Sequence, residues 1–252
     1  MKIWLSGAAG HMGRAIASLA EERGITVIAG LDRVDAGCAF PVCSSPADLP
    51  EGGDALIDFS APAVLDDLLP VLVERGIPAV LATTGYTDAQ LRAIDEAAAH
   101  IAIFRSANMS VGIALLRRLC AEAARALGPE YDIEIVEAHH HRKKDAPSGT
   151  ALMLSESIRS AREQASEVFG RHGRDCRRNP GEIGIHAIRG GTVTGEHQVM
   201  FLGDQERIVL SHSAENRSVF ASGALQAAAF LIGKAPGLYD MNDLIGEAIP
   251  SD

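Results

Sequence analysis

The sequence predicts an α/β fold in two parts: a domain with a doubly wound parallel sheet, followed by an α+β domain with a mixed or antiparallel sheet. Three observations predict it. Short apolar runs alternate with helical patterns over residues 1 to about 105, a glycine-rich turn follows the first run, and three strand-like runs occur in succession between residues 184 and 214. At 252 residues the chain can bury one large core or two modest ones.

The first part consists of strand candidates joined by helices. The strand candidates are "KIWLSG", "TVIAGLD", "DALIDFS", "PAVLATTG" and "IAIFRSA". Apolar residues recur at helical spacing in "MGRAIASLAEERG", which ends at Gly24, and in residues 62–75 and 87–100. Strands separated by helices of this length predict βαβ units and a parallel sheet.

The pattern changes at about Asn108. A helical run, "VGIALLRRLCAEAARALG", leads into the strand "YDIEIVEAHHH", and a second helix is expected from about Thr150 to Ala165. The runs "GIHAIRGG", "GEHQVMFLG" and "ERIVLSHSA" follow an arginine-rich loop, and their Gly-Gly and Gly-Asp connections suit turns of an antiparallel sheet. We expect a helix at 218–232 to return to the first domain, before a short tail. The expected division is therefore 1–107 with 218–252, and 108–217.

The composition argues against several classes of function. A formal net charge of -10 argues against nucleic-acid binding, which requires a basic surface. The N-terminal residues lack the apolar core of a signal peptide, and the most apolar stretches are shorter than the roughly 18 residues of a membrane span. The cysteines, Cys38, Cys43, Cys120 and Cys176, show no CxxC spacing. We expect a cytoplasmic protein with reduced thiols and no membrane partner.

A glycine-rich turn, "SGAAGHMGRA", joins the first strand to the first helix. Backbone N–H groups at a helix N-terminus can hold a pyrophosphate, and glycines let it approach, so this position predicts a Rossmann-like dinucleotide site. The spacing is Gly-x-x-Gly-x-x-Gly instead of the commoner Gly-x-Gly-x-x-Gly, and a tight turn without ligand is the alternative. The candidate residues are Gly7, Ala8, Ala9, Gly10, His11, Met12 and Gly13.

The second strand ends in "GLDR". Asp32 stands where an acidic residue meets the adenosine ribose of NAD, and Arg33 could receive the 2′-phosphate of NADP. The pair therefore predicts use of NADH or NADPH; two solvated loop residues are the alternative.

Three further segments end strands at the carboxyl edge of the predicted sheet, where ligands bind in open α/β folds. They are "DFS" at 58–60, "ATTG" at 82–85 and "SANMS" at 106–110. We expect Phe59 to pack near the cofactor and Thr83 and Thr84 to bond its nicotinamide ribose or carboxamide. The remaining cofactor candidates are Ala82, Ser106, Ala107, Asn108, Met109 and Arg217.

A basic cluster, "EAHHHRKKDAPSGTA", begins at Glu137. Successive strand side chains point to opposite faces, so His139, His140 and His141 cannot all reach one metal ion, and no metal is expected. Pro147 is followed by the start of a helix, where free N–H groups suit a carboxylate. Lys143 and one or two histidines would add charge and proton donors.

This cluster therefore predicts a pocket for a small anion, with a solvated basic loop as the alternative. Ser148, Gly149 and Thr150 supply its helix N-terminus. We expect His141, Arg142 and Lys144 to be surface or supporting charges.

The same segment resembles the signature of the 4-hydroxy-tetrahydrodipicolinate reductase family, also called dihydrodipicolinate reductases. The glycine turn, "GLDR", "DFS", "TTG", "GGTVTGEH" and "NRSVFASGA" match that family in order, so the resemblance covers nearly the whole chain. The chain departs from the common pattern at Ala82, where glycine is frequent, and at Met109, where phenylalanine is frequent.

The resemblance implies hydride transfer from NADH or NADPH to a cyclic dicarboxylate of lysine and diaminopimelate synthesis. It implies that His139 is a proton donor and acceptor, that Lys143 is a proton donor, and that His140, Gly149 and Thr150 bind carboxylates. It also implies a homotetramer joined through the C-terminal sheets.

Two other functions are compatible with parts of the sequence. One is a module that senses NAD(P)H without turnover, which would not need proton donors beside the Pro-Ser-Gly-Thr turn. The other is a metal-dependent hydrolase, which the spacing of the histidines disfavours.

Overall fold

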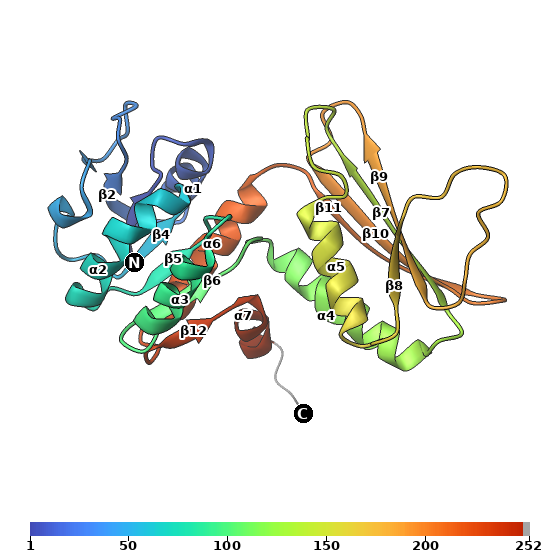
Figure 1. The fold of residues 1–252 in the computed structure, drawn as a ribbon. Helices are drawn as coiled ribbons and strands as arrows, with labels where there is room; N and C mark the ends of the chain where they lie inside the picture. The colour runs from blue at the N-terminus through green and yellow to red at the C-terminus, as the bar shows by residue number, and fades with distance from the viewer. Residues whose placement is uncertain (249–252) are drawn as a thin grey trace. The chain divides into compact units, whose positions relative to one another are not determined.

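The structure, a computed structural model, describes residues 1–248 and divides into two compact units (Figure 1). Unit 1 contains Met1–Val111 and the segment that begins at Arg217, and unit 2 contains Gly112–Asn216. Residues 249–252 of the predicted segment 218–252 lie outside the described range.

Unit 1 is built on a seven-stranded sheet in which every strand pair is parallel. In the order of the sheet the strands are β12 (Gly237–Tyr239), β6 (Ala102–Arg105), β5 (Ala79–Leu81), β4 (Ala55–Asp58), β1 (Lys2–Ser6), β2 (Thr26–Leu31) and β3 (Val42–Cys43). The chain order reverses at β1, which is the doubly wound arrangement that the sequence predicts.

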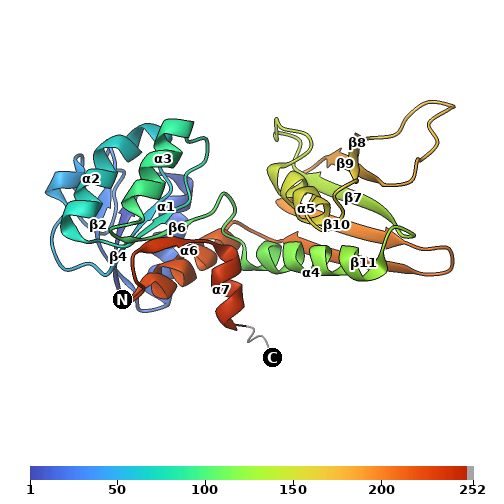
Figure 2. The same ribbon diagram turned by 60° about the horizontal axis from the view of Figure 1, so that its bottom comes forward.

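Helices cover both faces of this sheet (Figure 2). They are α1 (His11–Glu22), α2 (Leu65–Arg75), α3 (Asp88–Ala97), α6 (Ser218–Leu231) and α7 (Met241–Ala248), with 3-10 turns η1 (Pro46–Asp48) and η2 (Pro62–Val64). α2 and α3 close one core with Trp4 and Leu56, while α6 packs on α1 and on β4, β5 and β6. The last long helix of the chain is thus part of unit 1. The predicted short tail is wrong, because β12 extends the sheet beside β6 and α7 follows it.

Unit 2 carries a five-stranded mixed sheet. In sheet order the strands are β11 (Arg207–Ala214), β10 (Gly195–Leu202), β7 (Asp132–His139), β9 (Glu182–Arg189) and β8 (Ser166–Phe169), and the helices are α4 (Val111–Leu127) and α5 (Gly149–Arg159). β10 is antiparallel to β11 and β7, whereas β9 is parallel to β7 and β8.

Two local expectations for unit 2 are wrong. The predicted helix to Ala165 ends at Arg159, and β8 follows it. The Gly190-Gly191 connection does not form a hairpin, because β7 lies between β9 and β10. The connection instead passes around the end of β7, where the Gly190 N–H donates to the His139 carbonyl at 3.0 Å and the His140 N–H donates to the Val193 carbonyl at 2.7 Å.

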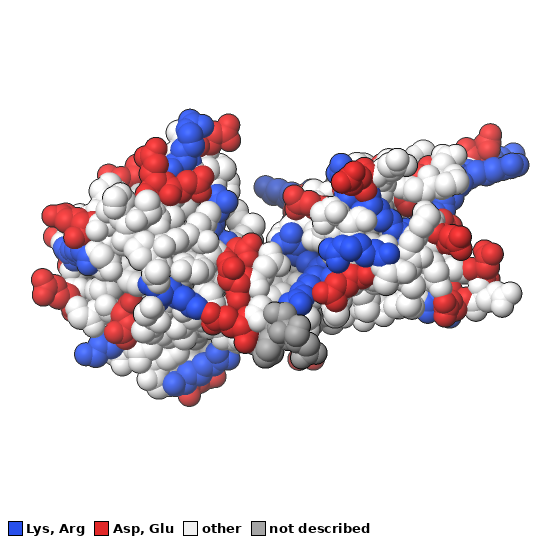
Figure 3. Space-filling model, turned by 90° about the horizontal axis from the view of Figure 1, so that it is seen from below, with Lys and Arg blue, Asp and Glu red and all other residues white. Residues whose placement is uncertain are grey.

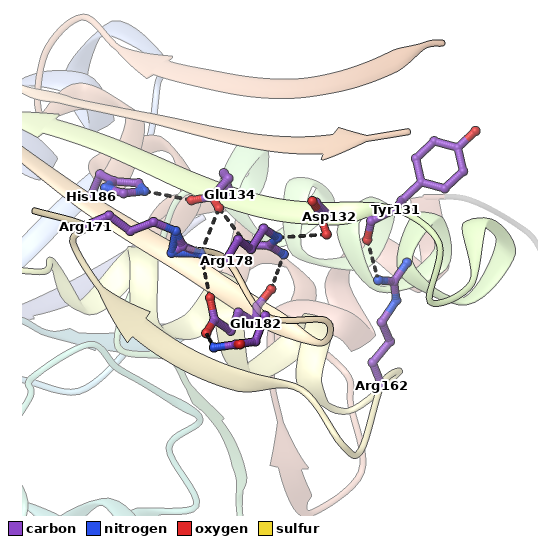
Figure 4. Close-up of polar contacts among 9 residues, drawn as sticks. Tyr131, Asp132, Glu134, Arg162, Arg171, Arg178, Glu182 and His186 are labelled. Carbon is purple, nitrogen blue, oxygen red and sulfur yellow. Dashed lines mark hydrogen bonds and ion pairs between the residues drawn. The ribbon is translucent and has the colours of Figure 1, made fainter. Parts of the chain in front are cut away.

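The two faces of the unit 2 sheet differ. Alternate residues of β7, among them Ile133 and Ile135, join α4 and α5 in a buried core. The other face carries apolar side chains that stay exposed, including Ile188 (54%) and Val209 (42%). It also carries Glu134, on which Arg171, Arg178 and His186 converge (Figure 4).

The described surface is mixed in charge. On the face seen in Figure 3, Lys and Arg side chains lie interspersed with Asp and Glu side chains on each unit. Within residues 1–248, no helix combines the length and the apolar character needed to span a bilayer.

Candidate functional site

The register of the unit 2 sheet brings four polar side chains to one end of β7. Glu137 and His139 share the face that carries the core, because they are two residues apart on one strand. His197 of β10 lies opposite Glu137, and Arg189 of β9 lies opposite His139.

Glu137 is the centre of this group and is fully buried. Arg189 donates to both of its carboxylate oxygens, at 2.7 and 2.8 Å, and the Ser148 backbone N–H donates to Oε1 at 2.9 Å. The imidazole Nδ1 of His139 lies 2.6 Å from Oε2. Burial opposes ionisation, but the hydrogen bonds from Arg189, His139 and Ser148 outweigh it and lower the pKa of Glu137.

His139 is 9% exposed, and its other ring nitrogen, Nε2, lies beside Gly195. A Cβ at Gly195 would stand 3.1 Å from Nε2. The absence of a side chain at Gly195 therefore leaves space next to this nitrogen.

The N-terminus of α5 meets the same group. The Ser148 hydroxyl caps the helix by accepting from the Ala151 N–H at 3.1 Å, and it lies 3.0 Å from Nε2 of His197. Burial, reinforced by the charge of His139, lowers the pKa of His197 to about 4. His197 is therefore neutral near pH 7, and the Ser148 hydroxyl can donate to its Nε2. Gly149 and Thr150 form the first turn of the helix.

The loop between β7 and α5 carries the other basic residues. Lys143 pairs with Asp145 at 2.9 Å, and Arg189 also donates to the Asp145 carbonyl at 2.7 Å, which ties the loop to the Glu137 group. His140 is half-buried. His141, Arg142 and Lys144 are exposed.

The glycine turn of unit 1 leaves little space for side chains. A Cβ at Gly7, whose φ is +76°, would stand 2.5 Å from the Phe59 carbonyl oxygen, and one at Gly13 would stand 2.3 Å from the Gly7 carbonyl oxygen. Gly10 is the N-cap of α1, and no side chain of the described residues caps this helix or places a carboxylate in its first turn. The turn thus fits an anion at its N–H groups.

Asp32 joins the end of β2 to this turn. Its Oδ2 accepts from the Ala9 N–H at 3.0 Å, and its Oδ1 accepts from the Arg33 N–H at 2.8 Å. Arg33 itself is exposed.

Asp58 connects two of the predicted cofactor segments. It is 2% exposed and accepts from the hydroxyls of Ser60 at 2.5 Å, Thr83 at 2.6 Å and Tyr86 at 3.4 Å. Burial and then the charge of Asp58 raise the pKa of Tyr86, which stays protonated. Thr83 is thereby fixed at the carboxyl edge of the sheet, whereas Thr84 is exposed.

The other cofactor candidates also belong to unit 1. The Ser110 N–H donates to the Asn108 side chain at 2.9 Å, and Met109 is buried against α6, where a Cβ at Gly223 would stand 1.7 Å from its carbonyl oxygen. The remaining candidates differ in exposure: Ala8 and Ala82 are buried, Met12, Phe59 and Ser106 are half-buried, and His11, Ala107 and Arg217 are exposed.

Comparison with known families accounts for both units. The model of the dihydrodipicolinate reductase N-terminus matches residues 1–109, and the model of its C-terminus matches residues 112–245. The chain belongs to the dihydrodipicolinate reductase family. Proteins named 4-hydroxy-tetrahydrodipicolinate reductase from Caldanaerobacter subterraneus and Clostridium novyi are 48% and 44% identical over 247 residues, which is 97% of this chain and 98% of each relative.

A solved structure of the family has the same fold. Dihydrodipicolinate reductase from Paenisporosarcina sp. TG-14, with dipicolinate bound, aligns over 97% of this chain and 99% of its own, with a TM-score of 0.81 and 24% identity.

Sequence reasoning missed four residues that organise these family segments: Asp58, Glu137, Arg189 and His197. A signal existed for one of them, because strand alternation puts Glu137 on the same face as His139. Arg189 and His197 come from strands whose pairing with β7 the sequence did not predict.

Proposed function

We propose that this chain is a 4-hydroxy-tetrahydrodipicolinate reductase of lysine and diaminopimelate biosynthesis. It would transfer a hydride from NADH or NADPH and a proton to the cyclic dicarboxylate, releasing water and tetrahydrodipicolinate. The observation that carries the proposal is the histidine held by a buried carboxylate beside a helix N-terminus, in a chain that matches the family along nearly its whole length.

Unit 2 would bind the substrate and contribute the protons. His139 and Lys143 are the proposed proton donors. Gly149 and Thr150 begin α5, and with His140 they would bind the carboxylates, because a helix N-terminus favours an anion. Ser148 would act by capping that helix, since its hydroxyl is engaged by Ala151 and His197.

Unit 1 would bind the dinucleotide. When bound, the nicotinamide supplies the hydride. Gly7 to Gly13 would hold the pyrophosphate, Asp32 and Arg33 would meet the adenosine ribose, and Thr83, fixed by Asp58, would meet the nicotinamide end. The segment Ser106–Met109 and Arg217 complete the proposed cofactor site.

The exposed apolar face of the unit 2 sheet supports a homotetramer. Ile188 and Val209 lie on the face away from α4 and α5, and an uncovered apolar patch of this kind suits contact with another copy. A cytoplasmic location follows from the proposed use of the reduced nicotinamide pool.

The test is the loss of reduced-nicotinamide absorbance when the product of dihydrodipicolinate synthase is generated in situ, with NADH and NADPH assayed separately. Rapid oxidation that depends on this substrate supports the proposal. Tight cofactor binding without oxidation would leave the dinucleotide site standing and remove the substrate assignment.

A further inference from the structure

We propose that Glu137, held by Arg189, is a positioning residue that keeps a proton on Nδ1 of His139 and thereby makes Nε2 the nitrogen that exchanges protons with the reacting molecule. The inference rests on the proposed function, because it deepens the role of His139 in that reaction. It concerns the tautomer of an imidazole, which can be measured without turnover.

The contacts of Glu137 show that its carboxylate accepts a hydrogen bond from His139. Three N–H donors from Arg189 and Ser148 hold it from two sides, and it is fully buried. An ionised carboxylate only accepts hydrogen bonds, so at 2.6 Å the Nδ1 of His139 must be the donor. The neutral imidazole then carries its hydrogen on Nδ1 and presents a lone pair on Nε2.

The neighbouring histidine cannot replace this carboxylate. The rings of His139 and His197 meet edge to face with their centroids 5.2 Å apart. Nε2 of His197 contacts Ser148, and its Nδ1 forms no hydrogen bond with His139 or with any other described residue. Glu137 is therefore the group that sets the hydrogen position on His139 among the described neighbours.

Arg189 gives Glu137 a fixed orientation. Its two nitrogens reach the two carboxylate oxygens separately, a bidentate geometry that specifies the plane of the carboxylate. The same guanidinium bonds the Asp145 carbonyl, so the pair also anchors the loop that carries Lys143.

The chain contains a matched control on the same strand. Glu134 lies on the opposite face of β7, is bonded by Arg171, Arg178 and His186, and takes no part in the proposed reaction (Figure 4). Glu134→Gln therefore removes a carboxylate with arginine and histidine partners without touching His139.

The experiment compares Glu137→Gln, the double variant Glu137→Gln/Arg189→Met, and Glu134→Gln in the full chain. The amide of the single variant brings an NH2 group against Arg189 and against either His139 or Ser148, which costs stability. The double variant removes both members of the buried pair, a change that is often neutral for stability. Each protein is assayed for kcat, KM, thermal unfolding and, with 15N-labelled histidine, the tautomer of His139, whose resonance is identified by its loss in His139→Gln.

We expect wild-type His139 to carry its neutral-form hydrogen on Nδ1. We expect the double variant to regain the unfolding temperature while its kcat stays about 10²–10⁴-fold below wild type with a smaller change in KM, as when a histidine loses the carboxylate that fixes its tautomer. Glu134→Gln should lower the unfolding temperature and keep both kcat and the tautomer.

Two results overturn the proposal. One is a wild-type His139 with its hydrogen on Nε2, which needs no variant to be observed. The other is a folded double variant with wild-type kcat. A wild-type protein without turnover would instead remove the proposed function, and the tautomer measurement would still decide the role of Glu137.

Discussion

The glycine turn of unit 1 and the Glu137 group of unit 2 are built in different ways. In the turn, backbone atoms crowd one another so closely that a Cβ at Gly13 would overlap the Gly7 carbonyl. In the Glu137 group, side chains from three strands and a helix N-terminus share one buried charge pair. The turn is local in sequence, whereas Arg189 lies 52 residues from Glu137.

The two sites should therefore respond differently to substitutions. A backbone site fails when atoms are added, and the charged residues at its edge can change at small cost because solvent screens them. A buried side-chain site fails when atoms are removed or charges are left unpaired.

Loss of the imidazole in unit 2 should have the largest effect. His139→Gln is expected to lower kcat by about 10²–10⁴-fold, the range typical of a lost acid–base group. Cofactor affinity, measured by fluorescence titration with NADH, should not change, because the proposed dinucleotide site lies in unit 1. The matched control is His141→Gln, since His141 is exposed. Equal rates for the two variants would remove His139 from the mechanism.

Adding one methyl group to the glycine turn should have the second-largest effect. In Gly13→Ala the new Cβ would stand 2.3 Å from one carbonyl oxygen and 2.6 Å from another, so the turn must open. We expect a loss of about 2–4 kcal/mol in the free energy of unfolding, as for other steric overpacking, and a weaker NADH affinity. Urea unfolding followed by Trp4 fluorescence measures the free energy of unfolding.

Gly246→Ala in α7 is the control, because no neighbouring atom of residues 1–248 lies within 4 Å of a Cβ there. If Gly13→Ala were as stable as this control and bound NADH equally well, the turn would not be limited by backbone packing.

The same contrast explains what the sequence could predict. The glycine turn, Asp32 and the parallel sheet follow from local patterns, since a strand, a turn and a helix are contiguous. The β7–β9 and β7–β10 pairings bring Arg189 and His197 to Glu137 across 52 and 60 residues, and two glycines suggested a hairpin where the chain passes around β7. A local turn signal carries no information about which strand occupies the neighbouring position.

The stability of the protein should depend on pH through the buried His197 of the Glu137 group. Burial lowers the pKa of His197 to about 4 from an ordinary value of 6.5, so the unfolded chain binds a proton here more readily than the folded one. The contribution of neutral His197 to the free energy of unfolding is fully present above pH 6.5 and is lost as the pH falls to about 4. Its maximum is near 3 kcal/mol. Urea unfolding followed by circular dichroism at several pH values measures this slope.

The slope should be shallower in His197→Gln, which cannot titrate. It should not vanish, because burial also lowers the pKa of His212. The groups that act on His197 are His139, Glu137, His212 and Lys143. An unchanged slope would show that His197 is not kept neutral by the fold.

The smallest effect is expected at the exposed edge of the unit 1 site. Arg33→Ala should weaken NADPH binding by about fivefold and leave NADH binding nearly unchanged, because an exposed guanidinium contributes about 1 kcal/mol to binding a phosphate. Arg92→Ala, which removes an exposed arginine from α3, controls for the general loss of charge. Since Arg33 bonds Asp32 only through its backbone N–H, the substitution leaves the link between Asp32 and the turn in place. An equal loss for both dinucleotides would mean that Arg33 supports the turn itself, and the edge of this site would then be as sensitive as its backbone.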